Sequence, residues 1–165
     1  MLSLNNISMY KFCQIPTLYR PLARSRLSTT TLVENTVKNF NNRLRIKEEQ
    51  YADTKSSPFS PGVQSAFEDI YNETIKAFDL PQMITSNVCA KLLHQIVRVL
   101  EPSRILEFGT FTGTSTIAMA SALKANGKLT SFDVNAEAQR IARRYIDKLQ
   151  LTARVNLCLE NGLDS

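Results

Sequence analysis

An acidic residue and two glycines stand where an α/β sheet would bind a ligand. Glu107 follows the apolar pair Ile105 and Leu106, and Gly109 and Gly113 come next, before a helical pattern begins. A strand that runs into a glycine turn and then a helix N-terminus brings backbone groups close to a cofactor. The spacing is Gly-x-x-x-Gly after a glutamate, not the Gly-x-Gly-x-x-Gly that is typical of dinucleotide pyrophosphate sites.

The ligand expected at this turn carries positive charge. A pyrophosphate needs close backbone approach from a helix N-terminus that faces two negative charges. A single looser turn beside the carboxylate of Glu107 suits a cationic ligand instead. S-adenosylmethionine, which has a sulfonium and an amino group, is such a ligand.

Two further residues are placed to contact this ligand. Asp133 ends a second predicted strand, 24 residues after Gly109, where a carboxylate can accept hydrogen bonds from both ribose hydroxyls. A lone aspartate after a strand is also common as a helix cap or turn residue, and that alternative stays open. Ser115 opens the next helix, where its hydroxyl and the free N–H groups can bind a carboxylate or simply cap the helix.

Helical patterns precede this region. Apolar residues at helical spacing predict helices over residues 33–52 and 63–78, separated by a loop rich in Ser and Pro. Thr85 and Ser86 form an N-cap pair for a third helix that runs to about Leu100, before Pro102. Its inward face is expected to hold Leu92, Leu93, Ile96, Val97 and Leu100.

Strands and helices alternate from residue 104 onward. Strands are predicted over residues 104–108, 128–132 and 154–159, with helices over 114–124 and 136–150, the second capped by Asn135. This order predicts an α/β fold with a parallel sheet and right-handed crossovers.

The charge of the chain is concentrated at its N-terminus. Residues 1–33 hold Lys11, Arg20, Arg24 and Arg26 and no acidic residue, whereas 16 basic and 15 acidic residues follow. A basic leader rich in Ser and Thr is typical of a mitochondrial transit peptide; an unspecialised disordered terminus, with a cytoplasmic protein, is the alternative. The nearly neutral remainder argues against a nucleic-acid surface, and no apolar run approaches the roughly 20 residues of a membrane span.

The cysteines and the single histidine are expected to be structural. Cys13, Cys89 and Cys158 are isolated thiols without a Cys-x-x-Cys pair, which argues against a zinc site or a disulfide framework. Cys89 and Cys158 lie among apolar residues and are expected to be buried. His94 has no second histidine or adjacent nucleophile, so a catalytic role is disfavoured.

Three segments together resemble a known family. Leu106-Glu-Phe-Gly-Thr-Phe-Thr-Gly-Thr-Ser, Gly127-Lys-Leu-Thr-Ser-Phe-Asp and Met83-Ile-Thr-Ser resemble, in order and at family spacing, the caffeoyl-CoA and catechol O-methyltransferases. The resemblance covers roughly residues 63–163. It implies a Rossmann-like S-adenosylmethionine-dependent methyltransferase fold. The predicted organisation is then the leader (1–33), a helical region of two or three helices (34–103), and the N-terminal half of the domain with parallel strands one to three (104–165).

The resemblance also implies a set of cofactor contacts. Thr85 would contact the methionyl end, Ser115 the carboxylate, Asp133 the ribose, and Gly162 would lie near the adenine. The full predicted set is Thr85, Glu107, Gly109, Thr110, Gly113, Ser115, Asp133 and Gly162. The chain departs from the family where Thr114 replaces the usual Tyr, so that an aromatic wall is missing, and where Glu160 replaces the usual Gly after the third strand.

The implied activity is methyl transfer from S-adenosylmethionine to a hydroxyl of a small catechol- or phenol-like acceptor. In this family a divalent cation, Mg²⁺, binds the acceptor diol, and its ligands and the general-base lysine follow the third strand. They are expected beyond Ser165, so that no metal or catalytic residue is assigned here and the chain is expected to be C-terminally truncated. A homodimer is possible, and the acceptor cannot be inferred.

Two alternatives remain beside the enzyme. The first is a non-catalytic, methyltransferase-like module that binds cofactor or a partner. The second is a nicotinamide-dependent oxidoreductase, against which the absence of Gly-x-Gly-x-x-Gly counts.

Overall fold

The computed structural model describes residues 6–8 and 46–162. Predictions for the rest of the leader, for Cys13 and for the helix that begins at Val33 lie outside these residues. The elements are β1 (Asn6–Ser8), α2 (Ile46–Lys55), α3 (Pro61–Ala77), the 3₁₀ turn η1 (Pro81–Met83), α4 (Asn87–Leu100), β2 (Arg104–Phe108), α5 (Thr114–Ala122), β3 (Lys128–Asp133), α6 (Ala136–Lys148) and β4 (Val155–Leu159).

The sheet has the order β1-β2-β3-β4, and all of its neighbours are parallel. Strands β2, β3 and β4 confirm the three predicted strands, and α5 and α6 connect them. The register pairs Phe108 with Phe132 and Asp133 with Leu159, so the carboxyl ends of the three strands lie together. Strand β1 was not predicted; its three residues, within the expected leader, pair with the start of β2.

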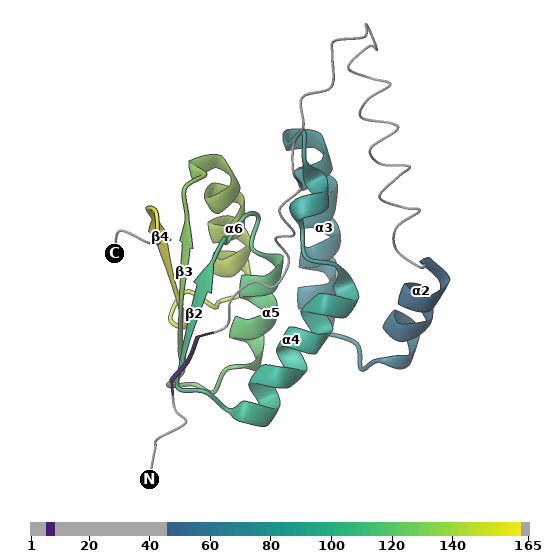
Figure 1. Cartoon of the computed structure of the whole chain (residues 1–165), viewed down its shortest axis with the longest axis horizontal. Helices are drawn as coiled ribbons and strands as arrows, with labels where there is room; N and C mark the ends of the chain where they lie inside the picture. The colour runs from purple at the N-terminus through teal and green to yellow at the C-terminus, as the bar shows by residue number, and fades with distance from the viewer. Residues whose placement is uncertain (1–5, 9–45, 163–165) are drawn as a thin grey trace, which may run out of the picture.

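The described helices lie on one side of the sheet (Figure 1). Along each strand, alternate residues face this helical layer and are buried, including Ile105, Leu129 and Val155. This alternation follows from the two-residue period of a strand. On the opposite face Phe108 and Phe132 are half-buried, and their rings stack with centroids 5.6 Å apart.

Helix α5 forms the centre of the helical layer. Its residues from Thr114 to Ala120 are all buried, and most are Ala, Ser or Thr. Small side chains on every face allow α4 on one side and the sheet on the other to approach closely. One hydrophobic cluster therefore joins α3, α4, α5 and α6 to the strands.

An ion pair between the buried Lys91 and the half-buried Asp53 fixes α2 to α4. Lys91 is only 7% exposed, and its Nζ lies 2.8 Å from Oδ1 of Asp53 and donates to the Asp53 carbonyl at 2.7 Å. A buried ammonium group requires such partners, because its desolvation costs several kcal/mol. Lys91 thus defines where α2 can pack.

The predicted helix ends agree with the structure to within a few residues. Ser86 caps α4 by accepting a hydrogen bond from the Cys89 N–H at 3.4 Å, and Asn135 caps α6 with bonds from Glu137 and Ala138 at 3.0 Å. Helix α2 continues three residues past its predicted end, and α5 stops two residues early because the backbone of Leu123 is extended.

Two burial predictions were wrong. Leu92 and Leu100, expected on the inward face of α4, are 59% and 50% exposed. Helix α4 has one broad apolar face, and only the part of it that holds Ala90 and Val97 is buried, whereas Leu92, Val99 and Leu100 are exposed. Cys89 is exposed and Cys158 is half-buried, so neither is a fully buried core residue.

In the described part of the chain, no helix is long and apolar enough to cross a membrane.

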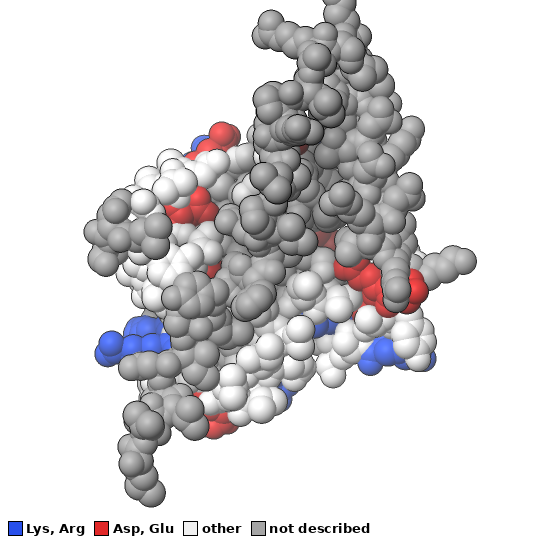
Figure 2. Space-filling model, in the orientation of Figure 1, with Lys and Arg blue, Asp and Glu red and all other residues white. Residues whose placement is uncertain are grey.

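Acidic and basic side chains are interspersed on the surface. On the face shown in Figure 2, the described Lys, Arg, Asp and Glu residues occur in small separate groups with uncharged surface between them. This agrees with the expected mixed surface of a nearly neutral body.

Candidate functional site

The predicted site residues gather at the carboxyl ends of β2, β3 and β4. The glycine turn (residues 109–113) follows β2, Asp133 ends β3, and Gly162 comes after β4. In an open parallel sheet, ligands bind at this edge. Gly162 lies against the stacked rings of Phe108 and Phe132, where an added Cβ would be 2.3 Å from Phe108 Cδ1. Only glycine fits at this position without displacing a ring.

Glu107 lies at the centre of a buried hydroxyl network. It is 2% exposed, and its Oε1 accepts a hydrogen bond from Ser115 Oγ at 2.5 Å. Its Oε2 accepts bonds from Thr116 Oγ1 at 2.5 Å and Ser131 Oγ at 2.7 Å. Hydrogen bonds to a carboxylate are stronger than those between neutral groups. The Glu107 carboxylate therefore ties the end of β2 to α5 and β3.

The glycine turn is held to β3 by its backbone. The N–H groups of Gly109 and Thr110 both donate to the Phe132 carbonyl, at 2.8 and 3.2 Å. The hydroxyls of Thr110 and Ser131 lie 2.6 Å apart. Gly113 has φ +92°, and an added Cβ would lie 2.7 Å from Ala142 Cβ. This glycine allows α5 to start in direct contact with α6.

Phe111 connects the glycine turn to the carboxylate of Asp133. Its φ is +48°, which is uncommon for a residue with a large side chain. Its N–H donates to Asp133 Oδ2 at 2.6 Å, and its ring lies 5.1 Å from the ring of Phe78. The other carboxylate oxygen, Oδ1, accepts the N–H of Asn135 at 2.8 Å. An ionised carboxylate has about four acceptor positions, so Asp133 can still accept bonds from a ligand.

The N-terminus of α5 has unused donors. Its N-cap, Gly113, makes no side-chain cap bond, and the first N–H groups of a helix have no acceptor within the helix. The hydroxyl of Thr114 is buried without a hydrogen-bond partner, whereas that of Ser115 is engaged by Glu107. A buried polar atom without a partner is rare and costly. This orphaned hydroxyl therefore marks the α5 N-terminus as a binding position for a polar ligand group.

The structure brings together most of the predicted set. Glu107 bonds Ser115 directly and is linked to Thr110 through Ser131. Gly109 and Thr110 share the Phe132 carbonyl, and Asp133 accepts the N–H of Phe111 in the same turn. Thr85 is half-buried before α4 and, among the described residues, makes no hydrogen bond to the glycine turn.

Sequence reasoning missed three contributors. These are Thr116 and Ser131, which bond Glu107, and Thr114, which it treated only as a departure from the family. Ser131 is buried between the half-buried Thr130 and Phe132, at the same period as the buried Leu129, and this period was a usable signal.

His94 lies away from the glycine turn. Its Nδ1 is 3.0 Å from the Ala118 carbonyl and 3.2 Å from Ser121 Oγ, and its ring packs edge-on against Phe59. These contacts join α4 to the middle of α5, which is the structural role expected from the sequence.

Two surface cavities lie elsewhere. One, of about 470 Å³, lies along α6 beside Arg140, Arg143 and Arg144. A smaller one, of about 160 Å³, lies at the ends of α4 and α5 near Val97 and Leu123. Neither is lined by a predicted site residue. Carboxyl-end geometry and the orphaned hydroxyl of Thr114 define the site better than cavity size does.

A charged cluster joins α3 to α6 outside this site. Arg144 and Tyr145 both bond the carboxylate of Glu73, and Lys148 pairs with Asp69 at 3.2 Å. The hydrogen bond to Glu73 raises the pKa of Arg144. Burial, followed by the negative charge of Glu73, raises the pKa of Tyr145 above its ordinary value of 10.0. The cluster stabilises the outer side of the helical layer.

Comparison with known proteins decides the family. A model of the O-methyltransferase family matches residues 58–165, which is more than half of the chain. The chain belongs to the O-methyltransferase family. The match includes α3, α4, the glycine turn and all three predicted strands. The family prediction is confirmed.

Individual relatives and solved structures agree. The catechol O-methyltransferase of Niastella koreensis is 32% identical over 85 residues, or 52% of this chain and 38% of that protein. An O-methyltransferase from Bacillus cereus, solved in complex with SAH, aligns with a TM-score of 0.63 at 28% identity, over 72% of this chain and 51% of that chain. The O-methyltransferase TomG from Streptomyces achromogenes, solved in complex with SAM, gives 0.62 at 26% identity over the same shares.

These alignments confirm the predicted Rossmann-like methyltransferase fold. The chain spans well under half of the curated relative and about half of each solved structure.

Proposed function

We propose that this chain binds S-adenosyl-L-methionine at the glycine turn and serves the transfer of its methyl group to a hydroxyl of a small catechol- or phenol-like acceptor. One observation carries the binding proposal. The α5 N-terminus, with the buried, unpartnered hydroxyl of Thr114, starts at the same turn whose Phe111 N–H bonds Asp133. Donors for a carboxylate and acceptors for a ribose thus lie on the two sides of one turn.

Each end of the cofactor has residues suited to it. The Thr114 hydroxyl and the free N–H groups of α5, that of Ser115 among them, would hold the carboxylate, since a helix N-terminus favours negative charge. Glu107 would attract the amino group through its negative charge, and Asp133 would accept bonds from the ribose hydroxyls. For the remaining members of the set we propose the roles that the family resemblance implies. Thr85 would contact the methionyl end, Gly109, Thr110 and Gly113 would line the cofactor with their backbone, and Gly162 would lie near the adenine.

The chemistry follows from the ligand and from how it is held. When bound, S-adenosyl-L-methionine supplies a methyl group on a positively charged sulfur, which an acceptor oxygen can attack directly. The residues named above bind and orient the cofactor, and this placement converts an encounter into a near-attack arrangement. No residue among those described is assigned the activation of the acceptor.

The divalent cation implied by the family resemblance does not fit the described residues. Within residues 6–8 and 46–162, no group of three or more His, Cys, Asp or Glu side chains is arranged to hold a metal ion. No reaction step is therefore assigned to a metal. The acceptor class rests on the names of the relatives, of which the chain covers only part.

Calorimetry with S-adenosyl-L-methionine and S-adenosyl-L-homocysteine tests the binding proposal. In Thr114→Val, an isosteric change, we expect the affinity to fall about threefold to tenfold, the worth of one hydrogen bond. The free energy of unfolding should not fall, because the variant removes an unsatisfied hydroxyl. Ser121→Ala, at the other end of α5, is the matched control. Absence of binding by the unmodified chain would disprove the proposal.

A methyl-transfer assay on catechol, with and without Mg²⁺, distinguishes the methyltransferase proposal from the alternative of a non-catalytic binding module. Turnover supports the methyltransferase proposal. Tight cofactor binding without turnover supports the non-catalytic binding module. Binding of a nicotinamide cofactor in place of S-adenosyl-L-methionine would favour the oxidoreductase.

We also propose that residues 1–33 direct the protein to mitochondria. The support is their composition, with Arg20, Arg24 and Arg26 and no acidic residue. Import of a leader–reporter fusion into isolated mitochondria, and its loss when the three arginines are replaced by glutamine, would support this proposal. We further propose that the protein forms a homodimer, which light scattering of the purified chain tests.

A further inference from the structure

Helix α3 contacts the glycine turn at two consecutive residues. Thr74 is fully buried, and its hydroxyl shares a hydrogen bond with the hydroxyl of Thr112 at 3.0 Å. Four residues later, the ring of Phe78 lies 5.1 Å from the ring of Phe111, at an interplanar angle of 57°. Thr74 lies in the last turn of α3 and Phe78 is its C-cap, so the end of α3 holds both side chains of the turn.

Both contacts are anchored on the α3 side. The Thr74 hydroxyl also bonds the Ile70 carbonyl at 2.6 Å, which fixes its rotamer. The Phe78 N–H donates to the Thr74 carbonyl at 3.1 Å as the last hydrogen bond of the helix. The side chains of Thr74 and Phe78 therefore move only if the end of α3 moves.

The turn residue that Phe78 contacts is conformationally strained. Phe111 has φ +48°, a conformation that persists only where its surroundings enforce it. The ring contact on one side and the N–H bond to Asp133 Oδ2 on the other, at 2.6 Å, are the interactions that enforce it. Loss of the ring contact would allow Phe111 to leave this conformation, and its N–H would then no longer be held against Asp133.

We infer that Thr74 and Phe78 are positioning residues for the cofactor, acting through Thr112, Phe111 and Asp133 without touching the ligand. This inference rests on the proposed function for its effect on affinity. Its structural part, the dependence of the Phe111–Asp133 hydrogen bond on Phe78, stands independently of any ligand.

The test uses Phe78→Leu in the full chain, with Phe59→Leu as a matched control. Phe59 is also an aromatic core residue, but it contacts Phe67 and His94 and not the turn. We expect Phe78→Leu to weaken S-adenosyl-L-homocysteine binding about tenfold, which corresponds to the usual cost of one strained residue. Thr74→Val should give a smaller loss in the same direction, and Phe59→Leu should lower thermal stability without changing the affinity.

A ligand-free readout follows the Phe111 amide proton by NMR. A short bond to a carboxylate shifts this proton downfield, and we expect the shift to decrease in Phe78→Leu and to stay unchanged in Phe59→Leu. In a double-mutant cycle of Phe78→Leu with Asp133→Asn, the two losses in the free energy of unfolding should be less than additive. Both substitutions act on the same Phe111–Asp133 hydrogen bond.

Two outcomes would overturn the inference. The first is an unchanged chemical shift of the Phe111 amide proton in Phe78→Leu, regardless of how this variant binds S-adenosyl-L-homocysteine. The second is a loss of affinity in Phe78→Leu that is matched by Phe59→Leu, since this would indicate general destabilisation. If the unmodified chain binds no cofactor but the amide responds to Phe78→Leu alone, the proposed function fails and the structural part of the inference holds.

Discussion

The backbone N–H of Phe111 and the carboxylate of Asp133 are joined by a hydrogen bond of 2.6 Å between residues 22 positions apart in the chain. Phe111 belongs to the turn after β2, and Asp133 is the last residue of β3. This bond therefore connects two neighbouring strand ends, and it sets the position of the carboxylate before any ligand arrives. Asp133 combines a structural and a proposed binding role.

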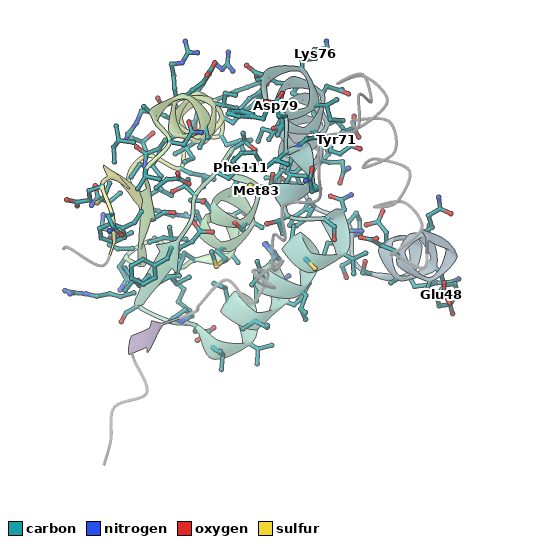
Figure 3. All side chains as sticks on the ribbon, turned by 45° about the horizontal axis from the view of Figure 1, so that its top comes forward. Glu48, Tyr71, Lys76, Asp79, Met83 and Phe111 are labelled. Atoms are coloured by element: carbon teal, nitrogen blue, oxygen red, sulfur yellow. The ribbon has the colours of Figure 1, made fainter. Side chains whose placement is uncertain are left out.

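Replacement of Asp133 by asparagine should weaken cofactor binding strongly. The amide nitrogen cannot accept a hydrogen bond, so one of the bonds from Phe111 and Asn135 is lost together with a proposed ribose acceptor. We expect a loss of roughly thirtyfold in affinity for S-adenosyl-L-homocysteine, as for two hydrogen bonds. Calorimetry measures it. Asp79→Asn is the control, since Asp79 is exposed near the end of α3 (Figure 3).

Replacement of Glu107 by glutamine should destabilise the fold. One carboxylate oxygen would become an NH₂ group, so that Ser115 at one oxygen, or Thr116 and Ser131 at the other, would lose their acceptor. We expect a loss of about 2–3 kcal/mol in the free energy of unfolding, measured by urea denaturation. The exposed Glu101→Gln should lose under about 1 kcal/mol. Equal stability of the Glu107 variant and the unmodified chain would show that the network contributes little.

A methyl group at Gly113 should be poorly tolerated. It would lie 2.7 Å from Ala142 Cβ, on a backbone with φ +92°. Gly113→Ala is expected to cost about 2–4 kcal/mol of stability, from overpacking and backbone strain together. Adding Ala142→Gly should recover only the steric part. In contrast, Gly62→Ala in α3 has ordinary contact with Leu149 at 3.7 Å and should stabilise the protein by up to about 1 kcal/mol.

Tyr145 should contribute to alkaline unfolding. Its pKa is raised, chiefly by burial, so the folded state keeps the phenolic proton after the unfolded state has lost it. Its contribution to stability is complete below pH 10.0 and decreases as the pH rises through the folded-state pKa. Urea melts between about pH 8 and 11 should show a smaller alkaline decrease for Tyr145→Phe. Tyr71→Phe, an exposed position, is expected to leave the slope unchanged.

The sequence predicted those elements whose pattern is local. Strong alternation or periodicity located β2, β3, β4 and α6, and Asn135 and Ser86 located two helix starts. In contrast, Leu92 and Leu100 were misplaced because the apolar face of α4 is broad, and only packing determines which part of it is buried. Strand β1 has three residues and pairs with a segment almost a hundred positions away, so no local pattern indicates it.

The site was predicted in position but not in its internal bonding. The motif identified Glu107, Ser115 and Asp133 as neighbours. It could not show that Ser115 is engaged by Glu107 or that the hydroxyl of Thr114 is left without a partner. These depend on rotamers and on which strand lies next to which, and neither is encoded in spacing alone.

Helix α5 has a further consequence because it exposes almost none of its surface. With Thr114 to Ala120 all buried, its axis cannot tilt without disturbing α3, α4 and the sheet together. The N–H groups at its start are thus oriented during folding, and a ligand meets them with little loss of conformational entropy. At this end of the proposed site, a ligand would therefore have to fit N–H groups whose positions are fixed. To bind a different ligand, the residues around α5 would have to change, because the helix itself cannot move.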